Sequence, residues 1–167
     1  MAMGLNINFL DAKLFGMKNG FCLDFITISN QSGEVISNNS SVAKSLTIRL
    51  KEALDQEVLS PKIVKRRQPK HLKHFNTDTI IKYKHDMTHR WTEIDIKTSD
   101  RPGLLASICQ VFLDHGALIR KARIATYGER AEDKFCITSK ENPPYLKKKD
   151  LERLINDMND SLSGVNK

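Results

Sequence analysis

The stretch SDRPGLLASICQVFLDHG, residues 99–116, decides the fold that this sequence predicts. Pro102 suits the first turn of a helix, where a missing N–H costs nothing. Ser99 or Asp100 can cap the start of that helix, and Gly116 can end it. The apolar residues between these signals recur at helical spacing, which predicts an amphipathic helix with the stripe Leu104, Leu105, Ile108, Val111 and Phe112.

The segments around this helix have the patterns of strands. Residues 89–99 alternate between apolar and charged side chains, which predicts a half-buried strand. Residues 117–128 and 131–139 indicate two more strands, joined by a hairpin in which Gly128 supplies the turn. The order strand, helix, strand, strand, helix predicts an α+β fold with both helices on one face of a small sheet. The second helix spans 146–162, with the stripe Leu151, Leu154, Ile155, Met158 and Leu162.

A ferredoxin-like sheet needs one more strand than this set contains. Residues 75–85 are rich in β-branched and aromatic side chains, and a short connection joins them to the strand that begins near Arg90. We therefore predict that Phe75–His85 pairs antiparallel with Arg90–Thr98, as in a permuted ferredoxin-like sheet. The alternative is that this strand caps the sheet of the preceding part of the chain.

The first part of the chain repeats a portion of this pattern. Residues 41–54 match the second helix, so the first copy has two strands and a helix and lacks an opening strand and a first helix. Because such a half-unit cannot close its own core, we expect a fragment of a longer chain, cut inside its first repeat. We also expect an open strand edge and an uncovered apolar helix face, relieved in a homodimer or by mutual support of the two units. The aligned pairs are Ala12 with Ala122, Leu14 with Ile124, Asp24 with Asp133 and Ile28 with Ile137.

The predicted organisation is a truncated repeat over 1–60, a basic linker over 61–74 and a second unit over 75–167. The net charge of +7 is concentrated in the linker, whose two prolines and lack of stacking aromatics favour a solvated connection over a nucleic-acid site. A basic interaction module that contacts nucleic acid or an acidic partner through Lys62–His74 is the alternative.

Composition narrows the class of protein. The 167 residues are 40% hydrophobic and 28% charged, which is ordinary for a soluble globular protein. No apolar run reaches the length of a membrane span and the start has no cleavage site, so we expect a cytoplasmic protein with no membrane partner. The three cysteines are too widely spaced for a disulfide framework or a zinc site.

We expect no catalytic, metal or cofactor site in this chain. The sequence lacks the Gly-Ser turn and paired aspartates with which a nucleotidyltransferase holds Mg²⁺ on a triphosphate. His85 precedes Asp86, but nothing in the pattern brings further ligands to this pair. His71, His74, His85 and His89 could gather on a metal ion, and their spacing favours ordinary loop histidines.

Three segments carry a resemblance to a known family: DRPGLL at 100–105, KARIATYGERAEDKF at 121–135 and RRQPKHLKHF at 66–75. The first resembles an ACT domain, a βαββαβ module that binds amino acids in many metabolic enzymes. Together they resemble the C-terminal tandem ACT region of bifunctional uridylyltransferase/uridylyl-removing enzymes, which act on the PII nitrogen-signalling protein. Residues 9–28 resemble that family's penultimate ACT repeat.

The resemblance implies a non-catalytic, glutamine-sensing regulatory region that controls nitrogen assimilation. The parent chain would then be a nucleotidyltransferase with uridylyl-removing hydrolase activity. Its Mg²⁺ would belong to catalytic domains absent here, and those domains and PII would be partners. An ACT module from another metabolic enzyme, sensing a different amino acid, is the alternative.

The turn at the start of the first predicted helix is the candidate ligand site. Asp100 can meet a ligand's α-amino group and Arg101 its carboxylate, beside the free N–H groups of the helix N-terminus. Gly103 has no Cβ, so a ligand can approach the backbone there. A capped helix with nothing bound uses the same groups and is the alternative. The candidate residues are Asp100, Arg101, Pro102, Gly103, Leu104 and Leu105.

Asp133 is a further charged feature. It shares a strand face with Phe135 and Ile137, so we expect it to point inward and to need a partner such as Arg123. An ordinary ion pair at a strand edge is the alternative.

Overall fold

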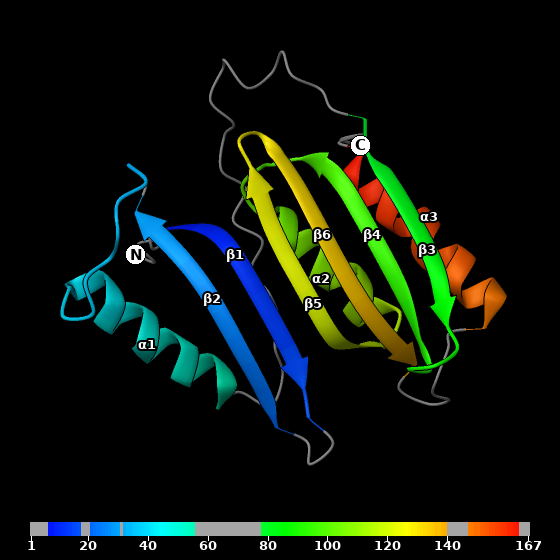
Figure 1. The fold of residues 1–167 in the computed structure, drawn as a ribbon, viewed down its shortest axis with the longest axis horizontal. Helices are drawn as coiled ribbons and strands as arrows, with labels where there is room; N and C mark the ends of the chain where they lie inside the picture. The colour runs from blue at the N-terminus through cyan, green and yellow to red at the C-terminus, as the bar shows by residue number, and fades with distance from the viewer. Residues whose placement is uncertain (1–6, 18–20, 31, 56–77, 140–146, 164–167) are drawn as a thin grey trace.

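The computed structural model describes residues 7–17, 21–30, 32–55, 78–139 and 147–163. These ranges form strands and helices in the order shown in Figure 1. The strands are β1 (Ile7–Gly16), β2 (Cys22–Asn30), β3 (Ile80–Asp86), β4 (Trp91–Ser99), β5 (Ala117–Tyr127) and β6 (Arg130–Ser139). The helices are α1 (Ser41–Leu54), α2 (Leu104–Asp114) and α3 (Lys148–Leu162).

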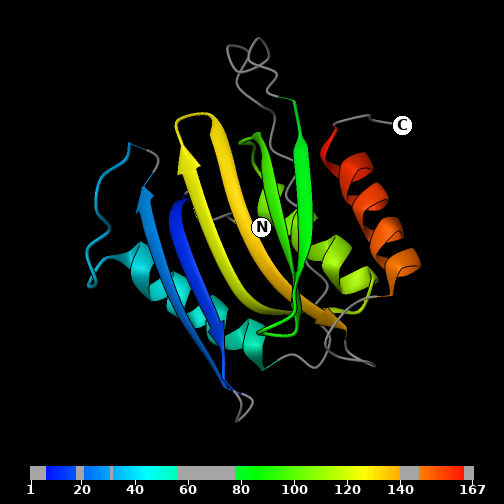
Figure 2. The ribbon, with the colours of Figure 1, turned by 45° about the vertical axis from the view of Figure 1, so that its right-hand side comes forward.

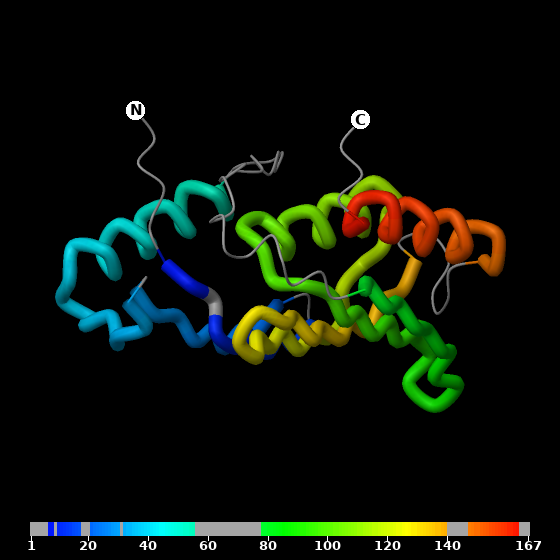
Figure 3. The backbone as a smooth tube through the Cα atoms, turned by 90° about the horizontal axis from the view of Figure 1, so that it is seen from above, coloured from blue at the N-terminus to red at the C-terminus, as the bar shows by residue number. Residues whose placement is uncertain are grey.

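The described strands make one six-stranded sheet in the order β2-β1-β5-β6-β4-β3. Every neighbouring pair is antiparallel. Seen from above (Figure 3), the three helices lie on one side of the sheet, and Figure 2 shows the same two layers from an oblique angle. The α+β prediction with helices on one face is therefore confirmed, and the other side is called the helix-free face below. None of the described helices has the length and apolar character needed to cross a membrane.

The strand predicted upstream of β4 pairs as expected. β3 runs antiparallel to β4, from Ile80 opposite Lys97 to Asp86 opposite Trp91. The strand starts later than predicted, and residues 75–77 lie outside the described ranges. The alternative pairing with the preceding unit is wrong, since β3 and the β1–β2 pair lie at opposite ends of the sheet.

The start of α2 differs from the prediction. Its N-cap residue is Gly103, in a left-handed conformation with φ 84°, and no side chain caps the helix. Capping by Ser99 or Asp100 is therefore wrong, and Pro102 precedes the helix instead of lying in its first turn. The left-handed backbone at Gly103 sets this later start, because it cannot continue a right-handed helix backwards. At the other end, Gly116 follows the last helical turn with φ 61°, as predicted.

The core lies between the helices α2 and α3 and the strands β4, β5 and β6. Phe112 of α2 meets Phe135 of β6 edge to face, with ring centroids 5.0 Å apart. Leu105 and Ile155 are partly buried against this cluster, so both predicted stripes face the sheet. The members of the two stripes that are fully buried are Leu104, Ile108, Val111, Phe112, Leu151, Leu154, Met158 and Leu162.

Strands β1 and β5 join the two parts of the chain into one sheet. Ala12 lies opposite Ile124 and Leu14 opposite Ala122, with Lys13 and Arg123 between them. In the sequence alignment Ala12 corresponds to Ala122 and Leu14 to Ile124, so the alignment converts each of these two pairs into the other. The pairing is therefore locally symmetric about Lys13 and Arg123.

The first part of the chain keeps apolar surface exposed. Helix α1 has no buried residue, and Ile48 and Leu54 are 57% and 80% exposed. β2 pairs only with β1 among the described strands, so its other edge is open apart from an isolated bridge between Ser29 and Val35. The predicted open edge and uncovered helix face are confirmed within the described residues. The domain limits at 60 and 74 and the basic linker lie outside them and stay predictions.

Candidate ligand site

The turn that joins β4 to α2 is short and tied to its surroundings by backbone hydrogen bonds. The N–H of Asp100 donates to the carbonyl of Glu129 in the β5–β6 hairpin, 2.7 Å away. The N–H of Leu104 donates to the carbonyl of Arg101, and the N–H and hydroxyl of Ser107 both donate to the carbonyl of Gly103. The turn is therefore a fixed platform at the hairpin end of the sheet.

The first turn of α2 presents N–H groups that the described backbone does not use. No backbone acceptor in the described part of the chain serves the N–H of Leu105 or Ala106. Such groups and the helix dipole favour a negatively charged ligand. Gly103, without a Cβ and with positive φ, leaves the backbone open beside them.

The six candidate residues have different roles in the structure. Asp100 and Pro102 are exposed, whereas Leu104 is buried in the core and Leu105 is partly buried against it. The Arg101 guanidinium donates from Nη2 to the carbonyl of Ser161, 2.8 Å away, in the last turn of α3. It therefore closes a helix C-terminus in this structure, a partner sixty residues away that sequence patterns do not indicate.

The Asp133 side chain lies near the turn between β4 and α2 and points into the protein, as predicted. It is 4% exposed and stands opposite Ile96, a core residue of β4. Its carboxylate accepts a hydrogen bond from the backbone of Ala125, and its Oδ1 has no hydrogen-bond partner in the described part of the chain. Burial, and secondarily the nearby charge of Asp100, raise the pKa of Asp133 to about 6 against the lowering effect of that hydrogen bond.

The predicted partnership of Asp133 with Arg123 is wrong. Arg123 stands opposite Lys134, one position along β6, and successive residues of a strand face opposite sides of the sheet. Burial raises the pKa of the Cys109 thiol on α2, and the charge of Asp133 adds to the effect. Asp133 is thus near both Asp100 and Cys109, and loss of hydration raises the pKa of all three groups.

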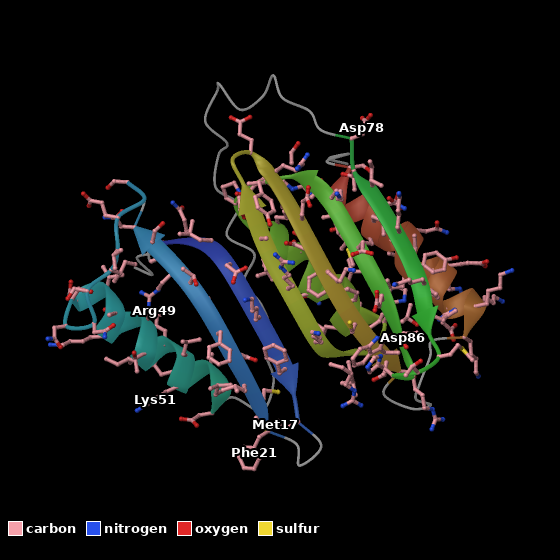
Figure 4. All side chains as sticks on the ribbon, in the orientation of Figure 1. Met17, Phe21, Arg49, Lys51, Asp78 and Asp86 are labelled. Atoms are coloured by element: carbon pink, nitrogen blue, oxygen red, sulfur yellow. The ribbon has the colours of Figure 1, made fainter. Side chains whose placement is uncertain are left out.

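A small cavity opens on the helix-free face next to Asp133. Its volume is about 210 Å³. The pairs Arg123–Lys134 and Thr126–Ala131 keep the same register of β5 and β6, and between them the Asp133 carboxylate accepts a hydrogen bond from the N–H of Ala125. Figure 4 shows this face toward the viewer, with the side chains drawn. The cavity is lined by Asp95, Ile96, Lys97, Arg123, Ala125, Tyr127, Glu132, Asp133 and Lys134.

The described histidines do not form a metal site. The described residues contain no group of three or more His, Cys, Asp or Glu side chains that could hold a metal ion. His89 pairs with Asp86 at 2.8 Å and stacks on Trp91, which together hold the turn between β3 and β4. His71 and His74 lie outside the described residues.

Comparison with known proteins gives one consistent result. Over 140 residues, 84% of its length, the chain is 38% identical to the bifunctional uridylyltransferase/uridylyl-removing enzyme of Pseudomonas putida (strain W619). It is 37% identical over the same length to the enzymes of the same name from Pseudomonas entomophila (strain L48) and Pseudomonas syringae pv. tomato (strain ATCC BAA-871 / DC3000). No family model and no solved structure matches.

These relatives confirm the resemblance that the sequence motifs carry. The chain spans about 16% of the length of the curated relatives that it matches. It is therefore homologous to a small part of a much larger enzyme.

Proposed function

We propose that this chain, as a homologue of part of a bifunctional uridylyltransferase/uridylyl-removing enzyme, is a non-catalytic regulatory region that binds a free amino acid, glutamine first. The non-catalytic role is supported by the extent of the match. The chain matches only a small part of these relatives, so most of their length is left to carry the catalytic domains. The fold supports an ACT assignment: the helices cover one face of an antiparallel sheet, and β3 takes the edge place beside β4. The truncated first repeat belongs to the same proposal.

The turn at Asp100–Leu105 carries the ligand-binding part of the proposal. The observation behind it is the left-handed Gly103, which leaves unused N–H groups at the start of α2, in the same turn as Asp100. A ligand carboxylate would accept hydrogen bonds from those N–H groups, while Asp100 would accept one from the ligand ammonium. Arg101 would keep its hydrogen bond to Ser161 and hold the turn against α3.

Binding of the amino acid at this turn would regulate other parts of a cytoplasmic enzyme. The catalytic domains of the parent chain would supply Mg²⁺ chemistry, with the PII protein as substrate. The open edge of β2 and the exposed face of α1 would be covered by those domains, by another ACT unit or by a second copy of the chain.

Calorimetry with glutamine tests the ligand and the site together. Gly103→Asn adds a side chain at the turn, and asparagine tolerates positive φ better than most residues. We expect the wild-type chain to bind glutamine and Gly103→Asn to lose at least tenfold in affinity while melting within a few degrees of wild type. Wild-type affinity in the folded variant would show that the turn is not the site.

A further inference from the structure

Aromatic and cationic side chains form two rows across β2, β1 and β5. In one row Lys13 of β1 stands between Phe25 of β2 and Arg123 of β5. Ala122 and Ile124, on either side of Arg123 in β5, are buried in the core under the helices, so this row lies on the helix-free face. The second row lies two positions along each strand and therefore on the same face. The six residues of both rows, called the aromatic–basic patch below, are Lys13, Phe15, Leu23, Phe25, Lys121 and Arg123.

The two aromatic rings of the patch are exposed to solvent. Phe15 is 37% exposed and Phe25 is 58% exposed. The rings meet edge to face, with centroids 6.5 Å apart, and Nζ of Lys121 lies 5.9 Å from the centroid of Phe15. The patch therefore holds aromatic rings and a cation in direct contact, on the face that Figure 4 turns toward the viewer.

The cations of the patch are not neutralised by the rest of the described sheet. Lys13, Lys121 and Arg123 are exposed, and none of them forms an ion pair with a carboxylate that the structure describes. Asp11, the next residue of β1 on this face, contributes one negative charge, so the patch and its border keep a net positive charge. On β3, β4 and β6, by contrast, the cations of the same face are paired, as in Lys84–Glu93 at 3.1 Å, Lys134–Asp95 at 3.2 Å and Lys97–Glu132 at 3.4 Å.

We propose that the aromatic–basic patch binds single-stranded nucleic acid, with bases stacked on Phe15 and Phe25 and phosphates paired with Lys13, Lys121 and Arg123. Exposed rings stack on bases of any sequence, and unpaired cations beside them bind the backbone. Neighbouring strands lie about 4.8 Å apart and alternate residues of one strand roughly 7 Å apart, so the patch has room for a few nucleotides. The bases of a duplex are stacked on each other and are not available to these rings.

The folded sheet supplies a combination that the basic linker lacks. The linker carries much of the net charge of +7 but has no stacking aromatics, which argued against a nucleic-acid site there. The pairing of β1 with β5 brings Phe15 to Lys121, more than one hundred positions away. The positive charge of the whole chain also attracts a polyanion to this face. The proposal goes beyond the proposed function and does not depend on it, because the turn at the start of α2 belongs to the other layer.

Fluorescence anisotropy with labelled probes of about 12 nucleotides tests the proposal on the 167-residue chain. The probes are oligo(dT), oligo(rU), an oligonucleotide of the same length in which every site is abasic, and a duplex of the same length. We expect oligo(dT) or oligo(rU) to bind, and the abasic strand and the duplex to bind at least tenfold more weakly. The logarithm of the binding constant should fall with the logarithm of the salt concentration with a slope of about −2, from three phosphate contacts at ~0.7 each.

Two substitutions separate the stacking from the charge. Phe25→Leu keeps an apolar side chain and removes the ring, so it should weaken oligo(dT) or oligo(rU) binding at least fivefold and leave binding of the abasic strand unchanged. Arg123→Gln should weaken binding of every strand and reduce the salt slope by about 0.7. Thermal melting would show that both variants are folded.

The controls remove the same groups outside the patch. Tyr83→Leu removes a ring that is 44% exposed on β3, opposite the core residue Ile94 and so on the other face. Lys51→Gln removes an exposed cation of α1. Both variants should bind the single strands within twofold of wild type and keep the salt slope.

The outcomes that overturn the proposal are specific. Binding of the abasic strand as tight as that of oligo(dT) and oligo(rU), or binding unchanged in Phe25→Leu, would show that no base stacks on the patch. Wild-type protein that binds neither single strand would reject the site. Binding to phosphatidylserine vesicles that exceeds strand binding and persists in Phe25→Leu would assign the patch to an anionic surface instead. Comparison of oligo(dT) with oligo(rU) shows which of the two nucleic acids binds more tightly.

The same variants separate this site from the proposed function. Gly103→Asn should bind the single strands as wild type does, and Phe25→Leu should keep the wild-type affinity for glutamine. Strand binding lost in Gly103→Asn while that variant remains folded would overturn the patch as the site. A chain that binds single strands but not glutamine would support the patch and reject glutamine as the ligand of the turn.

Discussion

Replacing Asp133 by asparagine should keep the fold and change how the free energy of unfolding depends on pH. The substitution keeps the shape of the side chain and removes a carboxylate that is 4% exposed and has one oxygen without a partner. The pKa of this carboxyl is about 6 in the folded chain and 3.8 in its ordinary state. The folded state therefore binds the proton more tightly than the unfolded state does.

The size and sign of the effect follow from that difference in pKa. Each pH unit between the two values corresponds to about 1.36 kcal/mol, so the full contribution is about 3 kcal/mol. The stabilisation is complete below pH 3.8 and is lost as the pH rises through about 6, because above that value the folded state must keep a buried charge. Asparagine does not titrate, so Asp133→Asn should gain stability relative to wild type as the pH rises from 4 to 7.

Urea unfolding at a series of pH values measures this difference. The free energy of unfolding of wild type and of Asp133→Asn would be determined at half-unit steps from pH 4 to pH 7.5. Loss of hydration also raises the pKa of Asp100, but Asp100 is common to both proteins, so its contribution largely cancels in the difference. Asp24→Asn, at an exposed position, should show no such trend. A difference between wild type and Asp133→Asn that stays constant across this range would refute the buried carboxylate as its cause.

Substitutions at three further positions test the local structure by urea unfolding or hydrogen exchange. Gly103→Ala should lower the free energy of unfolding by about 1 kcal/mol, because its φ of 84° disfavours any side chain; the gain expected for an alanine in ordinary helical conformation would contradict the left-handed turn. Arg101→Met should cost about 1.5 kcal/mol through loss of the hydrogen bond to Ser161, and Arg101→Lys should cost less; equal stability of all three proteins would show that this bond contributes nothing. Ser40→Ala should destabilise α1 by about 1 kcal/mol, because the Ser40 side chain accepts from the N–H of Ala43 at 3.2 Å, and unchanged hydrogen exchange in α1 would contradict the cap.

The elements of the second unit could be predicted because periodic patterns determine them. The stripes around Phe112 and Leu154 specify which face of each helix is buried, and the order of elements then limits the topology. Gly128 specifies a tight hairpin, and it has positive φ in the structure. Even the edge strand β3 followed from the sequence, since the sheet needed a strand that the C-terminus did not provide.

The groups around the candidate sites could not be predicted, because they depend on contacts between distant residues. Arg101 finds its acceptor at Ser161 only when α3 packs beside α2. The alternation along the strand correctly predicts that Asp133 points inward, but no sequence pattern reveals that its carboxylate accepts a hydrogen bond from the backbone of Ala125. The left-handed state of Gly103 was missed for a similar reason, since a glycine before a helix fits several turn geometries.

The junction between β1 and β5 has a consequence for the order in which the chain folds. It pairs residues more than one hundred positions apart, such as Asp11 with Ala125, and closing so long a loop is entropically costly and slow. The β5–β6 hairpin and its helices hold mostly nearer contacts and a buried core, so they can form first and offer β5 as a template. The β1–β2 hairpin, whose helix α1 buries no residue, would then add last. Pulse-labelling of amide hydrogens during refolding should therefore find protection in β6 and β4 before β1, and a protease acting on the folding intermediate should remove the N-terminal segment and leave the rest of the sheet intact.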